Sequence, residues 1–289
     1  MIHFSQHELD AWIAEDKTLQ DLTSEALGLP PVPAELAIVT RHAMTVCGVV
    51  PASRLARALG AEVTHGAHDG EQVAAGVCVL RVRGSARCLH VLWKQAMNLI
   101  EHLSGVASAT ANFLRAARQR NPRVQVAATR KTLPGTRRLM HYAVLCGGGI
   151  VHRSGLSETL LVFAQHRAFL QDAADWPAWT ERARTAAPEK LLLVEAETCE
   201  EALLAAQLGV DGVQLDKFSP ETLATLVPRL RALHPRLKVT VAGGIHVENV
   251  AAYADTGVDA LVTSSLYHAK AADCQATLVP LALAEGVKT

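Results

Sequence analysis

The chain has 289 residues, and its 28 Lys and Arg residues balance its 28 Asp and Glu residues, so its formal net charge is zero with histidine neutral. A chain without an overall positive charge lacks the field that draws proteins to nucleic acids or anionic lipids, and we expect neither as a partner. Apolar residues make up 49% and charged residues 19%, a balance typical of a globular protein with a sizeable core. The length favours one large domain or two unequal ones.

The first part of the chain contains short elements separated by prolines and glycines. Ser5 followed by Glu8 predicts a helix that begins with a capping box. Short β-prone pieces and one short helix then alternate, with strands expected over 37–39, 46–49, 62–64 and 77–82 and the helix over 54–59. A long helical segment follows over 90–117, with an interruption expected near Ser104-Gly105. This pattern favours a small antiparallel α+β unit, which we place at residues 1–112.

After residue 122, apolar β-rich runs alternate regularly with amphipathic helices. Strands are expected over 124–127, 159–163, 190–194, 212–215, 237–241 and 260–263, and helices over 134–144, 177–186, 200–208, 220–233 and 247–255. About six strand–helix units are typical of a parallel sheet that closes into an α/β barrel or part of one, here placed at residues 113–270. Residues 271–289 are expected to form a C-terminal helix that packs back on the N-terminal domain.

The cysteines and histidines do not suggest a metal centre or an exported protein. The six cysteines include no CxxC pair, and the thirteen histidines show no HxH or HExxH spacing. The N-terminal residues soon become acidic, unlike an export signal, and no apolar run approaches the length that spans a membrane. We therefore expect a cytoplasmic protein with reduced, mostly buried thiols.

Polar residues or glycines follow five of the expected strands. In chain order they are Arg130 and Lys131, Glu195, Asp216, Gly243 and Gly244, and Ser264 and Ser265. In an α/β barrel these positions share one face, at the carboxyl ends of the strands, where such barrels carry their active sites. Each position alone also has an ordinary explanation as a turn, a bend or a helix cap. Agreement between five strand ends favours a shared site.

The residue types at these strand ends suggest a magnesium-bound sugar polyphosphate. Glu195 and Asp216 would repel each other unless a cation lies between them, which predicts Mg²⁺; for either carboxylate alone, an ion pair with Arg130 or Lys131 is an equal alternative. The two glycines before a helix, and the hydroxyls of the two serines, are suited to a phosphate group. The cationic side of the site is expected to consist of Arg130, Lys131, His152 and Arg153, close to a triple glycine whose backbone can approach an anion.

Several longer motifs occur in an order that resembles one family. They are TRKTxPGxR, YAVxCGGGxxHRxGL, VEAET, LDxxSPE and GGIxxENVxxYAxTGVD, preceded by Glu15-Asp16, Asp21-Leu22-Thr23, Asn98 and residues 103–107. The chain thus resembles the nicotinate-nucleotide pyrophosphorylase (quinolinate phosphoribosyltransferase) family over nearly its whole length. The resemblance implies an N-terminal α/β sandwich and an incomplete α/β barrel of six or seven strands. It also implies a homodimer in which each sandwich closes the partner's barrel, with a hexamer as the alternative assembly.

The resemblance further implies a reaction and the residues that carry it. A pyridine dicarboxylate is joined to 5-phosphoribosyl 1-diphosphate, with release of pyrophosphate and carbon dioxide. At matching positions, the acceptor's carboxylates would be held by Arg130, His152 and Arg153, and the donor with its Mg²⁺ by Lys131, Glu195 and Asp216. The 5-phosphate would lie among Gly243, Gly244 and Ser264. Fixed carboxylates and a metal ion can stabilise the charges that develop as the diphosphate leaves.

The chain departs from the family pattern in the acceptor pocket. Phe163 stands where the family has a carboxylate-binding lysine, and Lys94 where an arginine from the partner subunit is expected. Val151 and Ala242 replace a family asparagine and serine. Loss of a cation would cost an anionic ligand about 1.5–3 kcal/mol, so a less charged acceptor is favoured. These departures resemble the ModD branch associated with molybdenum transport, whose acceptor need not be quinolinate.

Two other function classes are compatible with the same residues. A ligand-binding protein linked to molybdate uptake could keep the barrel without turnover, although binding alone would not require the metal carboxylates Glu195 and Asp216. A barrel lyase or aldolase could use Lys131 as a Schiff-base amine, which borohydride trapping would reveal.

Overall fold

The computed structural model describes residues 4–17 and 19–281. The chain divides into two compact units. The first takes in the described residues up to 109, residues 145–148 and residues 269–281; the second takes in residues 110–144 and 149–268. Each unit has its own sheet, and each is described separately here.

The first unit is built on an antiparallel sheet with the strand order β13-β1-β5-β3. The strands are β1 (Pro33–Thr40), β3 (Glu62–Gly66), β5 (Cys78–Ser85) and β13 (Cys274–Pro280). Every second residue of β1 is buried, so one face of the sheet packs on the core of the unit. The unit also contains three short helices and a two-stranded ribbon: α1 (Gln6–Asp16), α2 (Leu22–Ala26), α3 (Val49–Ala58), β2 (Met44–Thr45) and β4 (Gln72–Val73). The predicted capping box of α1 is confirmed, with the Ser5 backbone N–H 2.8 Å from Glu8 Oε2.

Three expectations for this unit are wrong. The strand expected over 46–49 is not formed, because β2 ends at Thr45 and helix α3 begins at Val49. Residues 274–280 form strand β13, which pairs antiparallel with β1 from Thr40↔Cys274 to Ala34↔Pro280, rather than part of a helix. The rest of the expected C-terminal helix, from 282 onwards, lies outside the described residues. Helix α4 (Ala86–Arg118) continues without interruption through Gly105. A Cβ at Gly105 would lie 2.3 Å from the Lys270 carbonyl oxygen, so this glycine permits a close approach of backbone rather than a break in the helix.

The second unit contains, within the described residues, a seven-stranded parallel sheet with the order β7-β6-β12-β11-β10-β9-β8. The strands are β6 (Gln125–Ala128), β7 (Ile150–Val151), β8 (Leu160–Val162), β9 (Leu192–Ala196), β10 (Gly212–Asp216), β11 (Lys238–Ala242) and β12 (Ala260–Thr263). Strands β7 and β8 form the two edges of an open barrel. The predicted fold class, an α/β sandwich followed by an incomplete α/β barrel, is confirmed.

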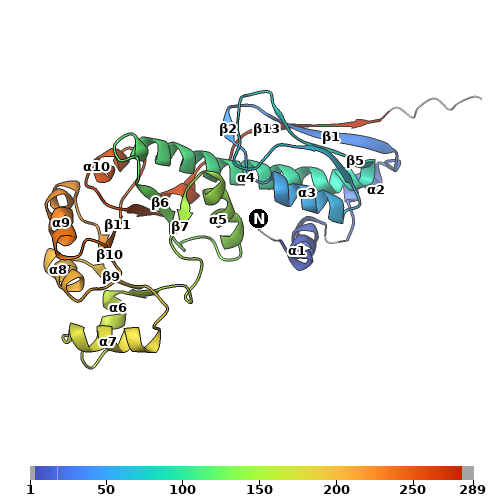
Figure 1. Cartoon of the computed structure of the whole chain (residues 1–289). Coiled ribbons are helices and arrows are strands. Elements are labelled where there is room, and N and C mark those ends of the chain that lie inside the picture. The colour runs from blue at the N-terminus through green and yellow to red at the C-terminus, as the bar shows by residue number, and fades with distance from the viewer. Residues whose placement is uncertain (1–3, 18, 282–289) are drawn as a thin grey trace, which may run out of the picture. The chain divides into compact units, whose positions relative to one another are not determined.

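Within the described residues, seven helical segments accompany the strands of the open barrel. They are α5 (Arg137–Cys146), α6 (Ala164–Arg167), α7 (Trp176–Ala186), α8 (Cys199–Gln207), α9 (Pro220–Leu233), α10 (Val250–Ala254) and the 3-10 helix η1 (Ser265–His268). Figure 1 shows α8, α9 and α10 outside strands β9 to β11. Helices α8 and α9 begin with side-chain caps, because Thr198 Oγ1 accepts from the Glu201 N–H and Ser219 Oγ from the Thr222 N–H. The carboxyl ends of the strands thus remain open to a cavity.

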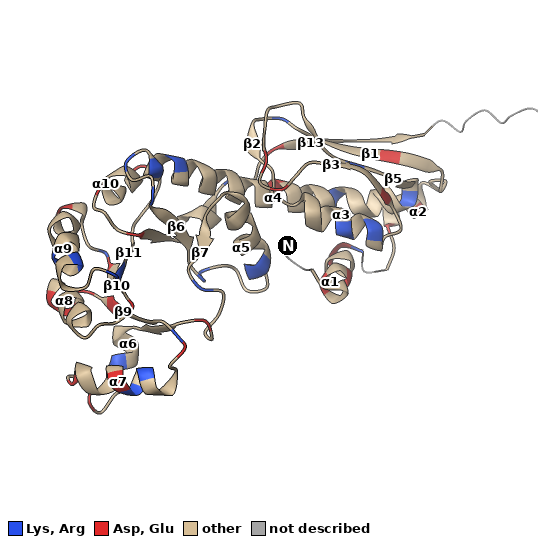
Figure 2. Ribbon diagram, in the orientation of Figure 1, with Lys and Arg blue, Asp and Glu red and all other residues tan. Residues whose placement is uncertain are grey.

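Charge and apolarity in the described residues agree with the composition. Basic and acidic residues are interspersed along both units in Figure 2, without segregation into a basic and an acidic unit. Among the described residues, no helix combines the length and the apolar character needed to cross a membrane.

Candidate active site

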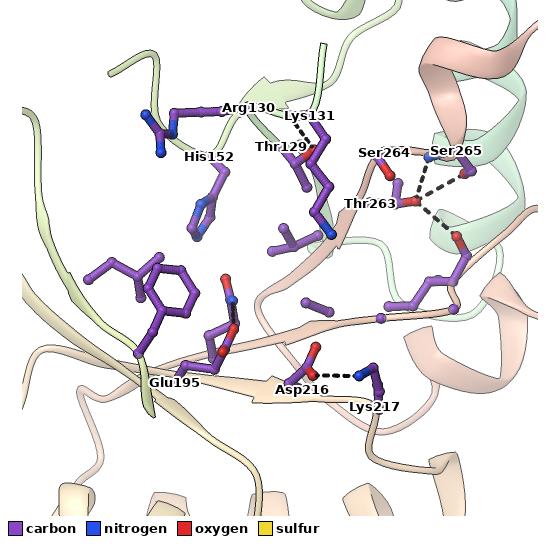
Figure 3. A pocket seen from close by; sticks show the side chains of 18 of the residues that line it. Thr129, Arg130, Lys131, His152, Glu195, Asp216, Lys217, Thr263, Ser264 and Ser265 are labelled. Carbon is purple, nitrogen blue, oxygen red and sulfur yellow. Dashed lines mark hydrogen bonds and ion pairs between the residues drawn. The ribbon is translucent and has the colours of Figure 1, made fainter. Parts of the chain in front are cut away.

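A cavity of about 800 Å³ opens among the carboxyl ends of the barrel strands, within the second unit. Its lining draws together residues of β8, β9, β10, β11 and β12 with residues of the segments that follow β6 and β7. All but one of the site residues named from the sequence line it: Arg130, Lys131, His152, Arg153, Phe163, Glu195, Asp216, Gly243, Gly244, Ser264 and Ser265. The exception is Lys94, which lies on α4 in the first unit. Figure 3 shows the labelled side chains gathered around the cavity.

The segment that carries Arg130 and Lys131 is fixed through Thr129. The Thr129 carbonyl accepts a hydrogen bond of 2.8 Å from the Tyr267 hydroxyl, and its Oγ1 accepts one of 3.1 Å from the Lys131 N–H. Burial raises the pKa of Tyr267 to about 12, so this hydroxyl stays a hydrogen-bond donor at neutral pH. These bonds direct the Lys131 side chain into the cavity (Figure 3).

His152 and Arg153 follow the edge strand β7 and add a neutral imidazole and a guanidinium group to the site. Burial, followed by the neighbouring Arg153 charge, lowers the pKa of His152 below its ordinary value of 6.5, so the imidazole is neutral at neutral pH. Burial, followed by the Arg130 charge, lowers the pKa of Arg153. The Arg153 side chain is buried with its guanidinium carbon 5.7 Å from the centre of the Phe163 ring. An anionic group bound here would offset the repulsion between Arg130 and Arg153.

Glu195 lies within β9 beside Gln214 of β10, which is its partner in the strand register. The Gln214 amide Nε2 donates a 2.6 Å hydrogen bond to Glu195 Oε2. Burial is the largest influence on this carboxylate and raises the pKa of Glu195, with smaller raising effects from the charges of Asp216 and Glu197; the Gln214 hydrogen bond and the Lys131 charge oppose them. Glu195 is thus a half-buried carboxylate that a bound cation would stabilise.

Removing the amide should make Glu195 harder to ionise. We expect Gln214→Met to shift the acid limb of any metal-dependent ligand binding to higher pH, because the variant loses the hydrogen bond that lowers the pKa of Glu195. Titration of ligand binding between about pH 4 and pH 8 measures this, given the ordinary range of carboxyl groups and the raised value here. An acid limb at the same pH as in the wild type would contradict the positioning role of Gln214.

Asp216 ends β10 and is followed by Lys217, whose Nζ lies 3.5 Å from Asp216 Oδ2. Gly243 lies against both residues. A Cβ at Gly243 would lie 2.7 Å from Lys217 Cγ and 3.1 Å from Asp216 Oδ1, and its φ of +93° also favours glycine. Glycine at 243 therefore permits the close packing of β11 against the end of β10.

The expected phosphate site at a helix N-terminus is not formed as the sequence suggested. Helix α10 begins only at Val250, so it does not start directly after the glycines, and the Gly244 carbonyl accepts from the Asn249 side chain at 2.9 Å. The Ser265 N–H donates to Thr263 Oγ1 at 3.0 Å and is already used. Both glycines and both serines still line the cavity, where backbone and hydroxyl groups remain next to its space.

The lining residues that were not named from the sequence include Gln214, Lys217 and Thr129. Gln214 lies two positions before Asp216 on the same strand, so alternation along β10 could have identified it. It is buried, and its Oε1, like His152 Nε2, has no hydrogen-bond partner within the described residues. No cluster of three or more His, Cys, Asp or Glu side chains suited to a metal occurs in the described part of the chain.

Comparison with known proteins assigns the chain to a family. The family model "Quinolinate phosphoribosyl transferase, C-terminal domain" matches residues 106–275, and the model of the N-terminal domain of the same family matches residues 21–104. These two matches take in the barrel strands, the cavity and most of the first unit. The chain belongs to the quinolinate phosphoribosyl transferase family.

Individual relatives agree with this family and point to one branch. The chain is 44% identical over 245 residues to a Rhodobacter capsulatus protein named ModD, covering 84% of this chain and 93% of that protein. It is 37% identical over 282 residues to ModD of Escherichia coli O6:H1, covering 98% and 99%. The solved nicotinate-nucleotide pyrophosphorylase of Francisella tularensis is similar with a TM-score of 0.86 and 27% identity, covering 94% of this chain and 95% of that one.

Proposed function

We propose that this protein transfers the 5-phosphoribosyl group of 5-phosphoribosyl 1-diphosphate to a ring nitrogen of a heterocyclic acid and releases pyrophosphate. The observation that carries the proposal is the convergence of Lys131, Glu195 and Asp216 with Arg130 and Arg153 in one cavity. The cations suit the anionic groups of both substrates, and the carboxylates suit the positive charge that develops at ribose C1 as the diphosphate leaves. The family supports the same reaction type.

The carboxylates fit a magnesium ion that is shared with the donor. Mg²⁺ keeps several waters and is usually held by one or two carboxylates together with substrate phosphates, so a cluster of three protein ligands is not required. Glu195 and Asp216 provide two carboxylates, and the pKa of Glu195 is raised mainly by burial and to a smaller extent by the Asp216 charge, effects that a bound cation would oppose. When bound, the ion would neutralise charge on the diphosphate. Gln214 orients Glu195 for this role, and Lys131 provides a further cation from the opposite side.

The acceptor proposed is less charged than a dicarboxylate. Arg130 and Arg153 can hold one carboxylate, while Phe163 provides a ring face where a second carboxylate would need a cation. His152, neutral at neutral pH, adds hydrogen bonding without charge. The pocket is thus suited to a planar heterocycle with a single carboxylate.

The test is release of pyrophosphate from 5-phosphoribosyl 1-diphosphate with Mg²⁺ and a panel of pyridine and purine-like acids. Acceptor-dependent release, stronger with a monocarboxylate than with quinolinate, is the expected result. Donor binding without release across the panel would instead favour a non-catalytic phosphosugar-binding protein. Absence of donor binding would reject the proposal as a whole.

A further inference from the structure

Lys217 has an unusual backbone conformation at the edge of the cavity. Its φ is +59°, and among the described residues it is the non-glycine residue with a positive φ. Such a conformation is disfavoured for a residue with a long side chain and is maintained only where its surroundings fix it. The Lys217 N–H donates a 2.8 Å hydrogen bond to the Ala242 carbonyl, which extends the β10–β11 pairing by one residue. The fold therefore holds this lysine at a defined place directly after Asp216.

The neighbouring strand makes room for the same side chain. A Cβ at position 243 would lie 2.7 Å from Lys217 Cγ, so glycine at that position is needed for the observed path of the lysine. Lys217 is among the residues that line the cavity. In Figure 3 its side chain turns toward Asp216, while Lys131 enters the same space from the opposite side. Two strands thus arrange one cation beside a candidate metal carboxylate.

The contact between Lys217 and Asp216 is not enough to explain this arrangement. Their charged atoms are 3.5 Å apart, and the Lys217 side chain is 79% exposed. Ion pairs this exposed contribute little to stability, so the pair does not compensate for the disfavoured backbone. It is also easily exchanged for another partner. An outlying backbone conformation beside a polar cavity points to a functional role for this residue.

We propose that Lys217 binds a phosphate oxygen of the phosphorylated donor when the donor is present. In the ligand-free site its ammonium group pairs with the Asp216 carboxylate and competes there with a divalent cation. This inference rests on the proposed function, which places a phosphosugar and a metal ion in this cavity. A cation entering with the donor takes the Asp216 carboxylate, and the exposed ammonium group then turns to the phosphate. Lys217 thereby couples binding of the metal to binding of the donor.

The inference predicts that one variant binds a metal ion more tightly and a phosphate more weakly than the wild type. Lys217→Met keeps most of the length of the side chain and removes its charge. We expect it to bind Mn²⁺ alone, measured by electron paramagnetic resonance on the ligand-free protein, about 3- to 10-fold more tightly, because the competing ammonium group is gone. We also expect it to bind a phosphate probe about tenfold more weakly in calorimetry.

Two probes identify which phosphate Lys217 binds. Ribose 5-phosphate presents only the 5-phosphate, and inorganic pyrophosphate presents only the leaving group. If Lys217→Met binds only one of the two probes more weakly, Lys217 contacts the phosphate that this probe presents. If it binds both probes more weakly, Lys217 lies between the two phosphate positions. Lys217→Arg should retain phosphate binding, and Lys238→Met, at the amino end of β11, is the matched control that should behave as the wild type.

A second variant shows whether a folding defect, rather than the lost charge, causes the changes in affinity. Lys217→Gly removes the charge and relieves the positive φ, so it should fold at least as well as the wild type and show the same two changes. Unchanged affinity for both phosphate probes, or unchanged Mn²⁺ affinity in both uncharged variants, would overturn the inference. These measurements need no acceptor and no turnover. Failure of the wild type itself to bind any phosphate probe would instead refute the proposed function.

Discussion

Replacing either carboxylate of the cavity, by Glu195→Gln or Asp216→Asn, is expected to weaken Mg²⁺-dependent binding of 5-phosphoribosyl 1-diphosphate by at least about 100-fold. Both side chains line the cavity and lie on adjacent strands, with Gln214 as the register partner of Glu195. An amide of the same shape keeps the packing and loses the negative charge that would hold the cation. Calorimetry with the donor, in Mg²⁺ and in excess chelator, measures the metal-dependent part.

The stability of the Glu195→Gln variant distinguishes loss of metal binding from loss of folding. Because the folded-state pKa of Glu195 lies above its ordinary value of 4.5, the folded state binds more protons than the unfolded state between these two values. The contribution of this group to the free energy of unfolding therefore falls as pH rises through that window. At neutral pH the ionised carboxylate destabilises the folded state. We expect Glu195→Gln to unfold at the same temperature as the wild type or higher.

A matched control lies two residues further along the chain. Glu197 is exposed and is not among the residues that line the cavity, so Glu197→Gln should leave donor binding unchanged. Donor affinity at the wild-type level in both Glu195→Gln and Asp216→Asn would reject the metal assignment. A loss shared by Glu197→Gln would show a general effect of charge rather than a specific site.

The sequence predicted which residues meet in the cavity better than it predicted their local structure. Alternation of strands and helices was sufficient to place Arg130, Glu195 and Asp216 on one face, because strands of a parallel sheet end at the same edge. Their positions within the strands were less certain. Glu195 was expected after its strand and lies inside β9, and β7 was missed because its two residues carry no periodic signal.

Local sequence patterns could not predict structural features that depend on tertiary contacts. Residues 274–280 form a strand because β1 offers them an edge, although the strand and its partner are more than 200 residues apart in sequence. The positive φ of Lys217 depends on the hydrogen bond to Ala242 and on the glycine at 243, both on another strand. Gln214 could have been found from the two-residue period of its strand. Its orientation toward Glu195 could not, since that requires the register between β9 and β10.

The second large effect is expected for the acceptor rather than the donor. Phe163→Lys should improve binding of the dicarboxylate quinolinate by about 10- to 150-fold, which corresponds to about 1.5–3 kcal/mol for a charged hydrogen bond. Phe163 lies beside Arg153, with 5.7 Å from the guanidinium carbon to the ring centre, and its ring stacks on His166 with centroids 5.6 Å apart. A lysine here would place a third cation near Arg130 and Arg153.

The comparison between two ligands makes this expectation specific. Three cations in one pocket repel one another, and burial together with Arg130 already lowers the pKa of Arg153. A dianion relieves that repulsion more than a monoanion does, so the ratio of quinolinate to nicotinate affinity should rise in the variant. Phe163→Leu is the control, because it removes the ring and its contact with Arg153 without adding charge. An unchanged ratio in Phe163→Lys, or the same rise in Phe163→Leu, would show that position 163 does not contact the acceptor's second carboxylate.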